Sequence, residues 1–239
     1  MGRTCTCGTL SLTYPRRTMG KITVDVKREV LRANDMLAEA LRREWASRSM
    51  LVVNLLSSPG SGKTALLERT LEILKGRMRV AVLEGDIETD RDAERIRAKG
   101  VEAVQITTGG TCHLEANMVA KAWERISDRD WDILFIENVG NLICPAGFDL
   151  GEHLRVVLLS VPEGDDKPAK YPKAFRTARW MVLTKMDLLP FFDFSPERAV
   201  SEAKRLRPDI RVFRTSAKTG EGVEEWANAL VEEYRKMYG

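Results

Sequence analysis

Apolar and polar residues follow two alternating patterns along the chain from residue 51 onward. Short runs rich in β-branched and other apolar residues predict buried strands, whereas apolar residues spaced three or four apart predict helices. The predicted strands cover 51–56, 79–83, 103–106, 132–136, 155–161, 180–183 and 211–214. Strands that alternate with helices are typical of a parallel sheet with helices on both faces. We therefore predict an α/β fold with a mostly parallel sheet.

Helical patterns fill most of the stretches between these strands. They are predicted from 64, over 92–99, from 116, over 196–206 and from 223 onward. Another helix, over 22–48, precedes the first strand. Its apolar residues recur at helical spacing at Val26, Val30, Leu37, Leu41 and Trp45. We expect this stretch to be an amphipathic helix that packs against the domain or against a partner.

The length of 239 residues suits one large α/β domain. We place this domain at 51–239 and assign 21–50 to the N-terminal helix. Residues 1–20 are rich in Thr, Arg and Gly without periodicity, which predicts a disordered tail. In such a domain, the ligand-binding loops gather at the carboxyl ends of the strands.

The turn after the first predicted strand carries a phosphate-binding motif. Residues 51–64 read LVVNLLSSPGSGKT, which contains most of the P-loop pattern G-x-x-x-x-G-K-[ST]. Ser57 replaces the first glycine of that pattern. The strand before the turn and the helix after it argue against an ordinary glycine-rich turn, so we expect a nucleoside triphosphate to bind here. The residues expected to contact it are Pro59, Gly60, Ser61, Gly62, Lys63, Thr64 and Ala65.

Each residue type of the motif has a physical role. Gly60 and Gly62 can adopt positive φ and turn backbone N–H groups toward a phosphate. The helix that follows offers unpaired N–H groups and the positive end of its dipole. Lys63 supplies a cation for the β- and γ-phosphates, and the Thr64 hydroxyl is the expected Mg²⁺ ligand.

Two further loops predict that the base is guanine. The segment Thr-Lys-Met-Asp, which ends at Asp187, matches the [NT]-K-x-D box that follows a late strand in GTPases. The Asp187 carboxylate can accept from N1–H and N2–H₂ of guanine, a donor pair that adenine lacks, and the Lys185 stem can cover the base plane. Ser216, Ala217 and Lys218 resemble the second base-contacting loop of GTPases. In this order behind a P-loop, the two boxes favour GTP over ATP.

Acidic residues at two strand ends are candidates for the hydrolysis chemistry. Asp86 follows the second strand and is expected to bind Mg²⁺ directly or through water. Glu137 ends the fourth strand, where a Walker-B carboxylate is expected, and Gly140 can donate its N–H to the γ-phosphate. Residues 137–140 read ENVG, which differs from the D-x-x-G of signalling GTPases. Elsewhere in the sequence we recognise no conventional catalytic glutamine or arginine finger. We expect slow, Mg²⁺-dependent hydrolysis with Lys63, Thr64, Asp86 and Glu137 as the catalytic set.

Cys112, His113 and Cys144 form a second constellation. Cys112 and His113 open the helix after the third strand, and Cys144 lies seven residues beyond Glu137, in the segment that should sense the γ-phosphate. Thiolate and imidazole suit Zn²⁺ in tetrahedral geometry and Ni²⁺ in planar geometry. Three ligands are too few for a closed structural site, which leaves an open position or a site shared across a dimer. Two buried cysteines and a helix-cap histidine are the alternative.

Charge and cysteine content narrow the partners and the compartment. Arginines in the tail account for the formal net charge of +3, so the sequence has no basic footprint for nucleic acid. No apolar run approaches the roughly 20 residues of a membrane span. Four cysteines without a secretory signal, together with a nucleotide site, predict a reducing cytoplasm and favour metal ligation over disulfides. Cys5 and Cys7 are either a small metal site or part of an unstructured extension.

At these residues the chain resembles a known family, the hydrogenase nickel-incorporation GTPases called HypB. The matching stretches include SSPGSGKT (57–64), EGDIETDRDAERIRAKG (84–100), TTGGTCHLEA (107–116), ENVGNLICPAGFDLGE (137–152) and TKMDLLP (184–190). The Cys-His and ENVGNL-x-CP stretches are distinctive of that family, whereas the P-loop is not. Together with other matches they cover nearly everything from residue 21 onward.

The resemblance implies a P-loop GTPase of the SIMIBI type that forms a homodimer with GTP or metal and helps to deliver nickel to [NiFe]-hydrogenase. It implies that Cys112, His113 and Cys144 bind nickel or zinc near the dimer interface. If they do, the segment after Glu137 carries a metal ligand, so its movement on hydrolysis would couple the GTP state to metal affinity. The implied partners are a HypA-like nickel chaperone and the hydrogenase large subunit. Lys167 and Lys170 resemble a basic loop of the family that reaches the nucleotide or the partner subunit; a solvated loop is the alternative.

Other functions fit parts of the pattern. A urease accessory GTPase would place its metal ligands as Cys-Pro-His, which this sequence lacks. An accessory GTPase for a cobalamin-dependent mutase is a related alternative. A switch GTPase with structural cysteines belongs to another class, from which metal-dependent dimerisation would separate a metallochaperone. Some family members carry an N-terminal C-x-x-C-G-C motif or a histidine-rich tract, whereas this tail has only Cys5, Cys7 and Gly8.

Overall fold

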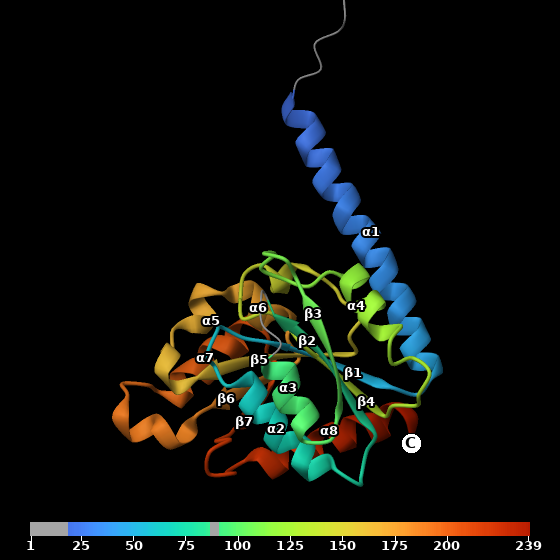
Figure 1. Ribbon diagram of the computed structural model, residues 1–239. Coiled ribbons are helices and arrows are strands. Elements are labelled where there is room, and N and C mark those ends of the chain that lie inside the picture. Colours follow the sequence, from blue (N-terminus) through green and yellow to red (C-terminus); the bar gives the residue numbers. More distant parts are fainter. Residues whose placement is uncertain (1–18, 87–90) are drawn as a thin grey trace, which may run out of the picture.

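The computed structural model describes residues 19–86 and 91–239, with side chains from residue 28 onward (Figure 1). Within these residues, seven strands form one sheet in the order β3-β2-β4-β1-β5-β6-β7, and every neighbouring pair is parallel. This confirms the predicted α/β class, with a sheet that is parallel throughout. Residues 1–18 of the predicted tail, with Cys5 and Cys7, lie outside the described residues, whereas Met19 and Gly20 belong to a helix instead of the disordered tail predicted for them.

Each strand lies where an apolar run predicts it, with small shifts at the ends. The strands are β1 (Leu51–Leu56), β2 (Val80–Asp86), β3 (Glu102–Thr107), β4 (Ile133–Glu137), β5 (Leu154–Ser160), β6 (Trp180–Thr184) and β7 (Arg211–Arg214). The largest difference is in β2, which continues beyond Leu83 because Glu84 pairs with Glu137 of β4, and Asp86 pairs with Thr107 of β3. The carboxyl edge of the sheet therefore carries acidic residues on two adjacent strands.

Helices cover both faces of the sheet (Figure 1). One face carries α2 (Lys63–Leu74), α3 (Arg91–Ala98) and α8 (Val223–Tyr238). The other carries α1 (Met19–Ser47), α4 (Ala116–Trp123), α6 (Pro172–Thr177) and α7 (Pro196–Leu206). Alternate residues of a strand point to opposite faces, so Val53 packs in the core under α2 and Val52 packs in the core under α1 and α4.

Helix α1 begins three residues before its predicted start. Its C-terminal part packs on α4, where Leu41 and Trp45 are buried in one cluster with Trp123. The two tryptophan rings meet edge to face with centroids 6.2 Å apart. Toward its N-terminus the helix extends beyond the rest of the domain (Figure 1), and Val30 is exposed there. Val26 of the predicted apolar stripe lies outside the residues whose side chains are described.

The connection after β5 differs from the loop expected there. It forms a short helix, α5 (Lys167–Lys170), directly before α6, and each of the two helices has a proline in its first turn, Pro168 and Pro172. Proline fixes φ near the helical value and lacks an N–H that would be unpaired in a first turn anyway. These prolines were therefore a usable signal for both helices. The described 3-10 turns are η1 (Pro145–Gly147), η2 (Val161–Glu163) and η3 (Met186–Phe191).

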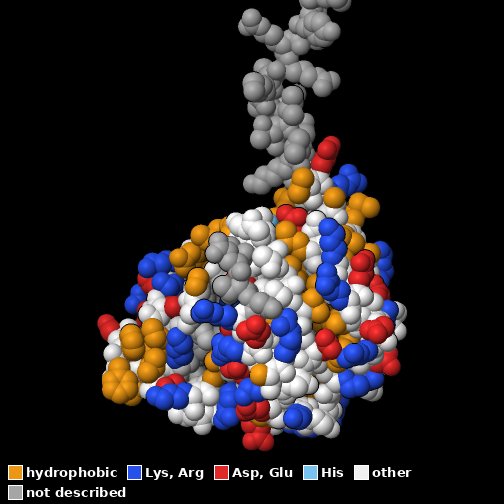
Figure 2. All heavy atoms as spheres, viewed as in Figure 1, with side chains coloured by type: hydrophobic (Ala, Val, Ile, Leu, Met, Phe, Trp, Pro, Cys, Tyr) orange, Lys and Arg blue, Asp and Glu red, His pale blue; other side chains and the backbone are white. Residues whose placement is uncertain are grey.

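Charges of both signs are mixed over the face that carries α2 and α3. Figure 2 shows Lys and Arg side chains interspersed with Asp and Glu on this face, and some of them form ion pairs, such as Arg95 with Glu68 at 2.6 Å. The view shows no single-sign patch of the kind that binds nucleic acid. Among the described residues, none of the helices is both long and apolar enough to cross a membrane.

Candidate functional site

The turn between β1 and α2 forms a cradle for phosphates. Gly60 and Gly62 have φ values of 72° and 89°, the left-handed conformation that glycine adopts without a steric penalty. Gly62 is the N-cap of α2 and has no side chain with which to cap it. The first N–H groups of the helix are therefore available to an anion. This cradle is one wall of a phosphate cleft of about 410 Å³.

Lys63 and Ser57 show how the motif is completed without its first glycine. Lys63 is only 8% exposed, and its Nζ donates to Ser57 Oγ at 2.9 Å. The Ser57 hydroxyl thus holds the ammonium group inside the phosphate cleft. A charge buried this deeply requires anionic partners, which neighbouring carboxylates and a bound phosphate can provide.

Three acidic side chains converge in the phosphate cleft. Glu84 of β2 and Glu137 of β4 are paired in register on adjacent strands, and Asp92 comes from the first turn of α3. One carboxylate oxygen of each lies within 4.8 Å of those of the other two. The hydroxyl of Thr64 donates to Glu137 Oε1 at 2.7 Å, so the predicted Mg²⁺ ligand Thr64 adjoins this carboxylate cluster.

The carboxylate cluster has the donor set of a Mg²⁺ site. Hydroxyl and carboxylate oxygens are the ligands that this ion prefers. The Oε2 atoms of Glu84 and Glu137 are buried without a hydrogen-bond partner among the described residues. Burial, followed by the charge of Glu137, raises the pKa of Glu84 far above its ordinary value. The pair therefore retains a proton when no cation is bound, and binding of a divalent cation would release it.

Two of these acids, Glu84 and Asp92, are not among the site residues predicted from the sequence. Asp86, which is, ends β2 and lines the same cleft, where it stays a candidate for contacting Mg²⁺. A signal for Glu84 was present, because it directly follows an apolar strand run, as Glu137 does. The position of Asp92 depends on the path of the chain after β2, which hydrophobic periodicity does not give.

The segment after β4 passes closely against the P-loop. A Cβ at Gly140 would lie 2.9 Å from the Cα of Pro59, so this approach requires glycine. Asn138 and Val139 are buried and line the phosphate cleft together with Gly140. Gly140 therefore stays a candidate to donate its N–H to a γ-phosphate.

A second cavity, of about 290 Å³, adjoins the cleft at the ends of β6 and β7. Its lining includes Asp187, Ala217 and Lys218, three of the residues predicted to contact the base. We therefore call it the base cavity. Ser216 does not line it, but its Oγ donates to Asp187 Oδ1 at 2.6 Å and so orients that carboxylate. The two predicted base-contacting loops are thus brought together by the pairing of β6 with β7.

Lys185 connects the base cavity with the phosphate cleft. It lines both, and its backbone is left-handed with φ of 58°. Its Nζ donates to the Gly60 carbonyl at 2.7 Å, so its stem crosses between the two cavities. The Thr184 hydroxyl donates to the Ser61 carbonyl at 2.6 Å. The P-loop and the base-contacting loop are therefore joined at two points.

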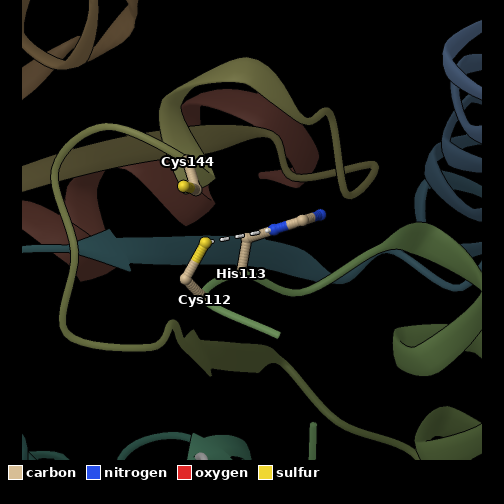
Figure 3. Close-up of side chains that lie close together, drawn as sticks. All are labelled: Cys112, His113 and Cys144. Carbon is tan, nitrogen blue, oxygen red and sulfur yellow. Dashed lines mark hydrogen bonds between the residues drawn. The ribbon is translucent and has the colours of Figure 1, made fainter. Parts of the chain in front are cut away.

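The structure brings Cys112, His113 and Cys144 together, as the metal hypothesis requires (Figure 3). A sulfur or nitrogen atom of each lies within 4.8 Å of those of the other two. Cys112 and His113 come from the segment between β3 and α4, and Cys144 directly precedes η1. All three side chains are half-buried, so the group is accessible from the surface. We refer to Cys112, His113 and Cys144 as the metal cluster, after the metal hypothesis.

Neighbouring side chains fix how the His113 ring faces the metal cluster. The ring stacks on Phe148 with centroids 3.9 Å apart and planes inclined by 23°. Its Nδ1 lies 3.8 Å from Cys112 Sγ, whereas its Nε2 lies 3.5 Å from Glu115 Oε1 without hydrogen-bond geometry. His113 can therefore bind a metal through Nδ1 while Nε2–H faces Glu115, an arrangement common among metal-binding histidines.

The donor chemistry of the metal cluster fits a borderline metal ion. The hydrogen bond with Cys144, followed by burial, raises the pKa of Cys112, so without a metal this side chain favours the neutral thiol. Metal binding would displace the proton. Two sulfurs and one imidazole nitrogen suit Ni²⁺ or Zn²⁺ and leave coordination positions open.

The basic pair Lys167 and Lys170 lies on α5. Lys170 is exposed and its Nζ pairs with Asp166 at 2.6 Å, whereas Lys167 is half-buried. Neither lysine lines the phosphate cleft or the base cavity. Their predicted role therefore depends on a second subunit.

Comparison with known proteins identifies the family. The sequence model of the CobW/HypB/UreG nucleotide-binding domain matches residues 51–214. The chain is 52% identical over 212 residues to the hydrogenase maturation factor HypB of Azotobacter chroococcum mcd 1, an alignment that covers 89% of this chain and 69% of the relative. The chain belongs to the HypB family. It is also 40% identical over 224 residues to the hydrogenase/urease maturation factor HypB of Helicobacter pylori, with 92% of each chain covered.

Solved structures of HypB proteins share this architecture. The crystal structure of HypB from Helicobacter pylori in complex with nickel matches with 41% identity and a TM-score of 0.83, covering 86% of this chain and 97% of that one. HypB from Archaeoglobus fulgidus matches with 40% identity and a TM-score of 0.80, covering 85% and 100%. These findings confirm the resemblance to the hydrogenase maturation GTPases and the predicted fold.

Proposed function

We propose that this protein is a GTP-dependent metallochaperone that assists the insertion of nickel into a [NiFe]-hydrogenase. The observation that carries the proposal is the course of the segment after β4. It begins at Glu137 in the carboxylate cluster, touches the P-loop at Gly140 and brings Cys144 to Cys112. One short segment therefore links the phosphate cleft with the metal cluster.

Nucleotide and metal would influence each other through this segment. A bound γ-phosphate would hold the Gly140 N–H, and hydrolysis would release it. Because Cys144 follows on the same segment, a shift at Gly140 would change its distance from Cys112 and thereby the metal affinity. The coupling is reciprocal, so metal would change the GTP affinity by the same factor.

The residues of the phosphate cleft would carry out Mg²⁺-dependent hydrolysis. Lys63 and the P-loop N–H groups would neutralise charge on the β- and γ-phosphates. Thr64 and Glu137 would hold Mg²⁺, which supplies further charge stabilisation when bound. The other candidates for this ion are Asp86, Glu84 and Asp92.

Hydrolysis would be slow because the described cleft offers little help to the attacking water. Among the described residues that line it, Arg95 is the only arginine, and none is a glutamine. Arg95 pairs with Glu68 at 2.6 Å and with Asp92 at 2.8 Å, so its charge is already engaged. A slow GTPase suits a switch that persists until its cargo is transferred.

A homodimer would complete the metal cluster. The three ligands leave coordination positions open, and Ile143, next to Cys144, is 66% exposed. An exposed apolar side chain beside an incomplete metal site suits a contact with a second copy. We place the GTP- or metal-promoted interface here, with Lys167 and Lys170 reaching the nucleotide or the other subunit.

For the remaining partners we rely on the resemblance to the family. A HypA-like nickel chaperone would exchange the ion with this protein, the hydrogenase large subunit would receive it, and transfer would take place in the cytoplasm. Ni²⁺ is then the cargo, and Zn²⁺ is an alternative occupant. A role in urease maturation is the second candidate, because the Helicobacter pylori relative is named as a hydrogenase/urease maturation factor.

Size-exclusion chromatography with light scattering on the metal-free full chain tests the proposal. GTPγS and either Ni²⁺ or Zn²⁺ are added separately and together. We expect dimers to form, and we expect Cys112→Ala to lose the response to metal but to retain the response to GTPγS. Ser127→Ala serves as the control, because Ser127 lines neither the phosphate cleft nor the base cavity and is not part of either ligand cluster.

The metal content of each variant is measured in parallel by mass spectrometry. A monomer that does not respond to metal, with equal metal content in the wild type and Cys112→Ala, would contradict the proposal. The protein would then be a GTPase with structural cysteines.

A further inference from the structure

Asn34 lies on α1, outside the nucleotide and metal sites, yet it joins the two segments that carry the metal ligands. Its Nδ2 donates to the Asp149 carbonyl at 2.8 Å, and its Oδ1 accepts from the Ala116 N–H at 2.8 Å. Ala116 begins α4 three residues after His113, and Asp149 lies five residues after Cys144. We call residues 112–116 and 144–149 the two ligand arms. One side chain holds both arms.

Both ends of the Asn34 amide are used, and the side chain is 8% exposed. The Ala116 N–H belongs to the first turn of α4, where it has no acceptor within the helix. The N-cap residue Glu115 makes no side-chain capping bond. Asn34 of α1 supplies the acceptor for the Ala116 N–H instead. Removing the amide would leave a buried N–H and a carbonyl without this partner, which carries an energetic penalty.

Helix α1 makes further contacts with the same parts of the fold. Arg42 donates two hydrogen bonds to the Asp149 carboxylate, at 2.6 and 2.7 Å. Glu44 accepts from Trp123 Nε1 of α4 at 2.8 Å. The helix is thus attached independently to the second ligand arm and to the helix that follows the first.

The two ligand arms also contact each other directly. The His113 ring stacks on Phe148, and the sulfur atoms of Cys112 and Cys144 lie within 4.8 Å of each other. Asn34 differs from these direct contacts because it bonds to backbone groups of residues that are not themselves metal ligands. It can therefore hold the arms in the same relation whether or not a metal is bound.

We propose that Asn34 is a positioning residue of the metal centre, which sets the separation of the two ligand arms and thereby the metal affinity. The inference rests on the proposed metal binding by Cys112, His113 and Cys144. A site assembled from two arms binds tightly only when the arms are held near the separation that the ion requires, because ordering them consumes binding free energy. Outer partners that orient metal ligands act in the same way.

Asn34→Ala in the full chain tests this inference. The Ni²⁺ and Zn²⁺ affinities are measured by competition with a chromophoric chelator, and Co²⁺ is used as a spectroscopic probe of thiolate coordination. We expect the affinity to fall about tenfold or more, as it does when other outer partners are lost. We also expect the Co²⁺ absorption bands to shift, while the GTP affinity of the metal-free protein stays unchanged.

Leu41→Ala is the matched control. Leu41 lies on the same helix as Asn34, is 5% exposed and packs in the core between α1 and α4. Its apolar side chain makes no hydrogen bond to either arm. The substitution loosens α1 by removing apolar contacts and leaves the Asn34 bonds intact. Asn34→Asp is the second variant. It keeps an acceptor for the Ala116 N–H but loses the donor to Asp149, so it too should weaken metal binding.

Equal metal affinities in the wild type and both Asn34 variants would overturn the inference. Equal losses in Asn34→Ala and Leu41→Ala would also overturn it, because the effect would then come from general loosening of α1. A wild-type protein that binds neither Ni²⁺ nor Zn²⁺ would refute the proposed function, and this inference with it.

Discussion

The phosphate cradle and the metal cluster lie on one sheet but are assembled in different ways. The cradle is one continuous turn, in which the glycine backbone angles and the bond between Lys63 and Ser57 are set within 57–64. The metal cluster takes its ligands from two arms, one before and one after β4 in the sequence. Phe148 of the second arm packs on His113 of the first. A site encoded in one turn should tolerate distant changes, whereas a site assembled from two arms should not.

Lys63→Ala is expected to have the largest effect on the nucleotide half of this comparison. It removes a buried cation from the phosphate cleft, and losing one partner of a buried charged contact typically costs about 2–5 kcal/mol. We expect the GTP affinity, measured with a fluorescent GTP analogue, to fall about a hundredfold or more. The Ni²⁺ affinity of the nucleotide-free protein should not change.

The control for this variant is Lys75→Ala, which removes a lysine just after the end of α2. A loss of nickel affinity in nucleotide-free Lys63→Ala would show that the two sites depend on each other even without GTP. The contrast between a local and an assembled site would then be wrong.

Asp187→Asn tests whether the base cavity reads guanine. The substitution keeps the size of the side chain but removes the charge that would accept from N1–H and N2–H₂, and each hydrogen bond to a charged group contributes about 1.5–3 kcal/mol. We expect about a hundredfold weaker GTP binding and a smaller preference for GTP over ATP, both measured by calorimetry. Asp193→Asn, an exposed acid after η3, is the control. An unchanged ratio of GTP to ATP affinity would exclude Asp187 as the guanine-reading residue.

The locally encoded parts of the molecule could be predicted from the sequence. A strand, a glycine-rich turn and a helix in succession gave the P-loop and the left-handed glycines, because each depends on neighbours in the chain. The parallel sheet followed from alternating periodicities. Glu84 was missed although it directly follows an apolar run, as Glu137 does. What the run does not show is the in-register pairing of β2 with β4 that brings the two carboxylates together.

The metal ligands were identified by residue type, but the contacts that support them were not. Cys112, His113 and Cys144 are conspicuous in any sequence because their side chains ligate metals. Phe148 and Asn34 are ordinary residues whose positions matter only after α1 and the loop before β5 have packed together. Hydrophobic periodicity gave α1 as an amphipathic helix and contained no information about the polar residue that it brings to the ligand arms.

Phe148→Leu tests the assembled site from its other side. Leucine keeps apolar volume but loses the ring stack on His113, and aromatic pairs contribute about 0.5–1.5 kcal/mol beyond burial. We expect Ni²⁺ affinity to fall about fivefold in the chelator assay, with GTP affinity unchanged in the metal-free protein. Phe192→Leu, which alters an exposed phenylalanine, is the control. Unchanged nickel affinity would mean that the stack does not help to hold His113 in place.

The two histidines extend the comparison to a smaller effect. His113 belongs to the metal cluster, whereas His153 directly precedes β5. Its Nδ1 accepts from the Val52 N–H at 3.1 Å, and its Nε2 is buried without a partner among the described residues. Burial, followed by the charge of Arg42, lowers the pKa of His153 below its ordinary value of 6.5.

His153→Asn should make the stability of the metal-free protein less sensitive to acid. The pKa of His153 is lower in the folded protein than in the unfolded chain. Below about pH 6.5 the unfolded chain therefore binds a proton that the folded protein does not bind. The contribution of His153 to stability is thus fully present above that pH and is lost as the pH falls. One such proton contributes at most about 1.4 kcal/mol per pH unit. Asparagine cannot titrate, yet its Oδ1 can accept from Val52. Urea unfolding of both proteins between pH 5 and 7 should therefore give a shallower slope for the variant, and equal slopes would mean that His153 is protonated as readily in the folded chain as in the unfolded one.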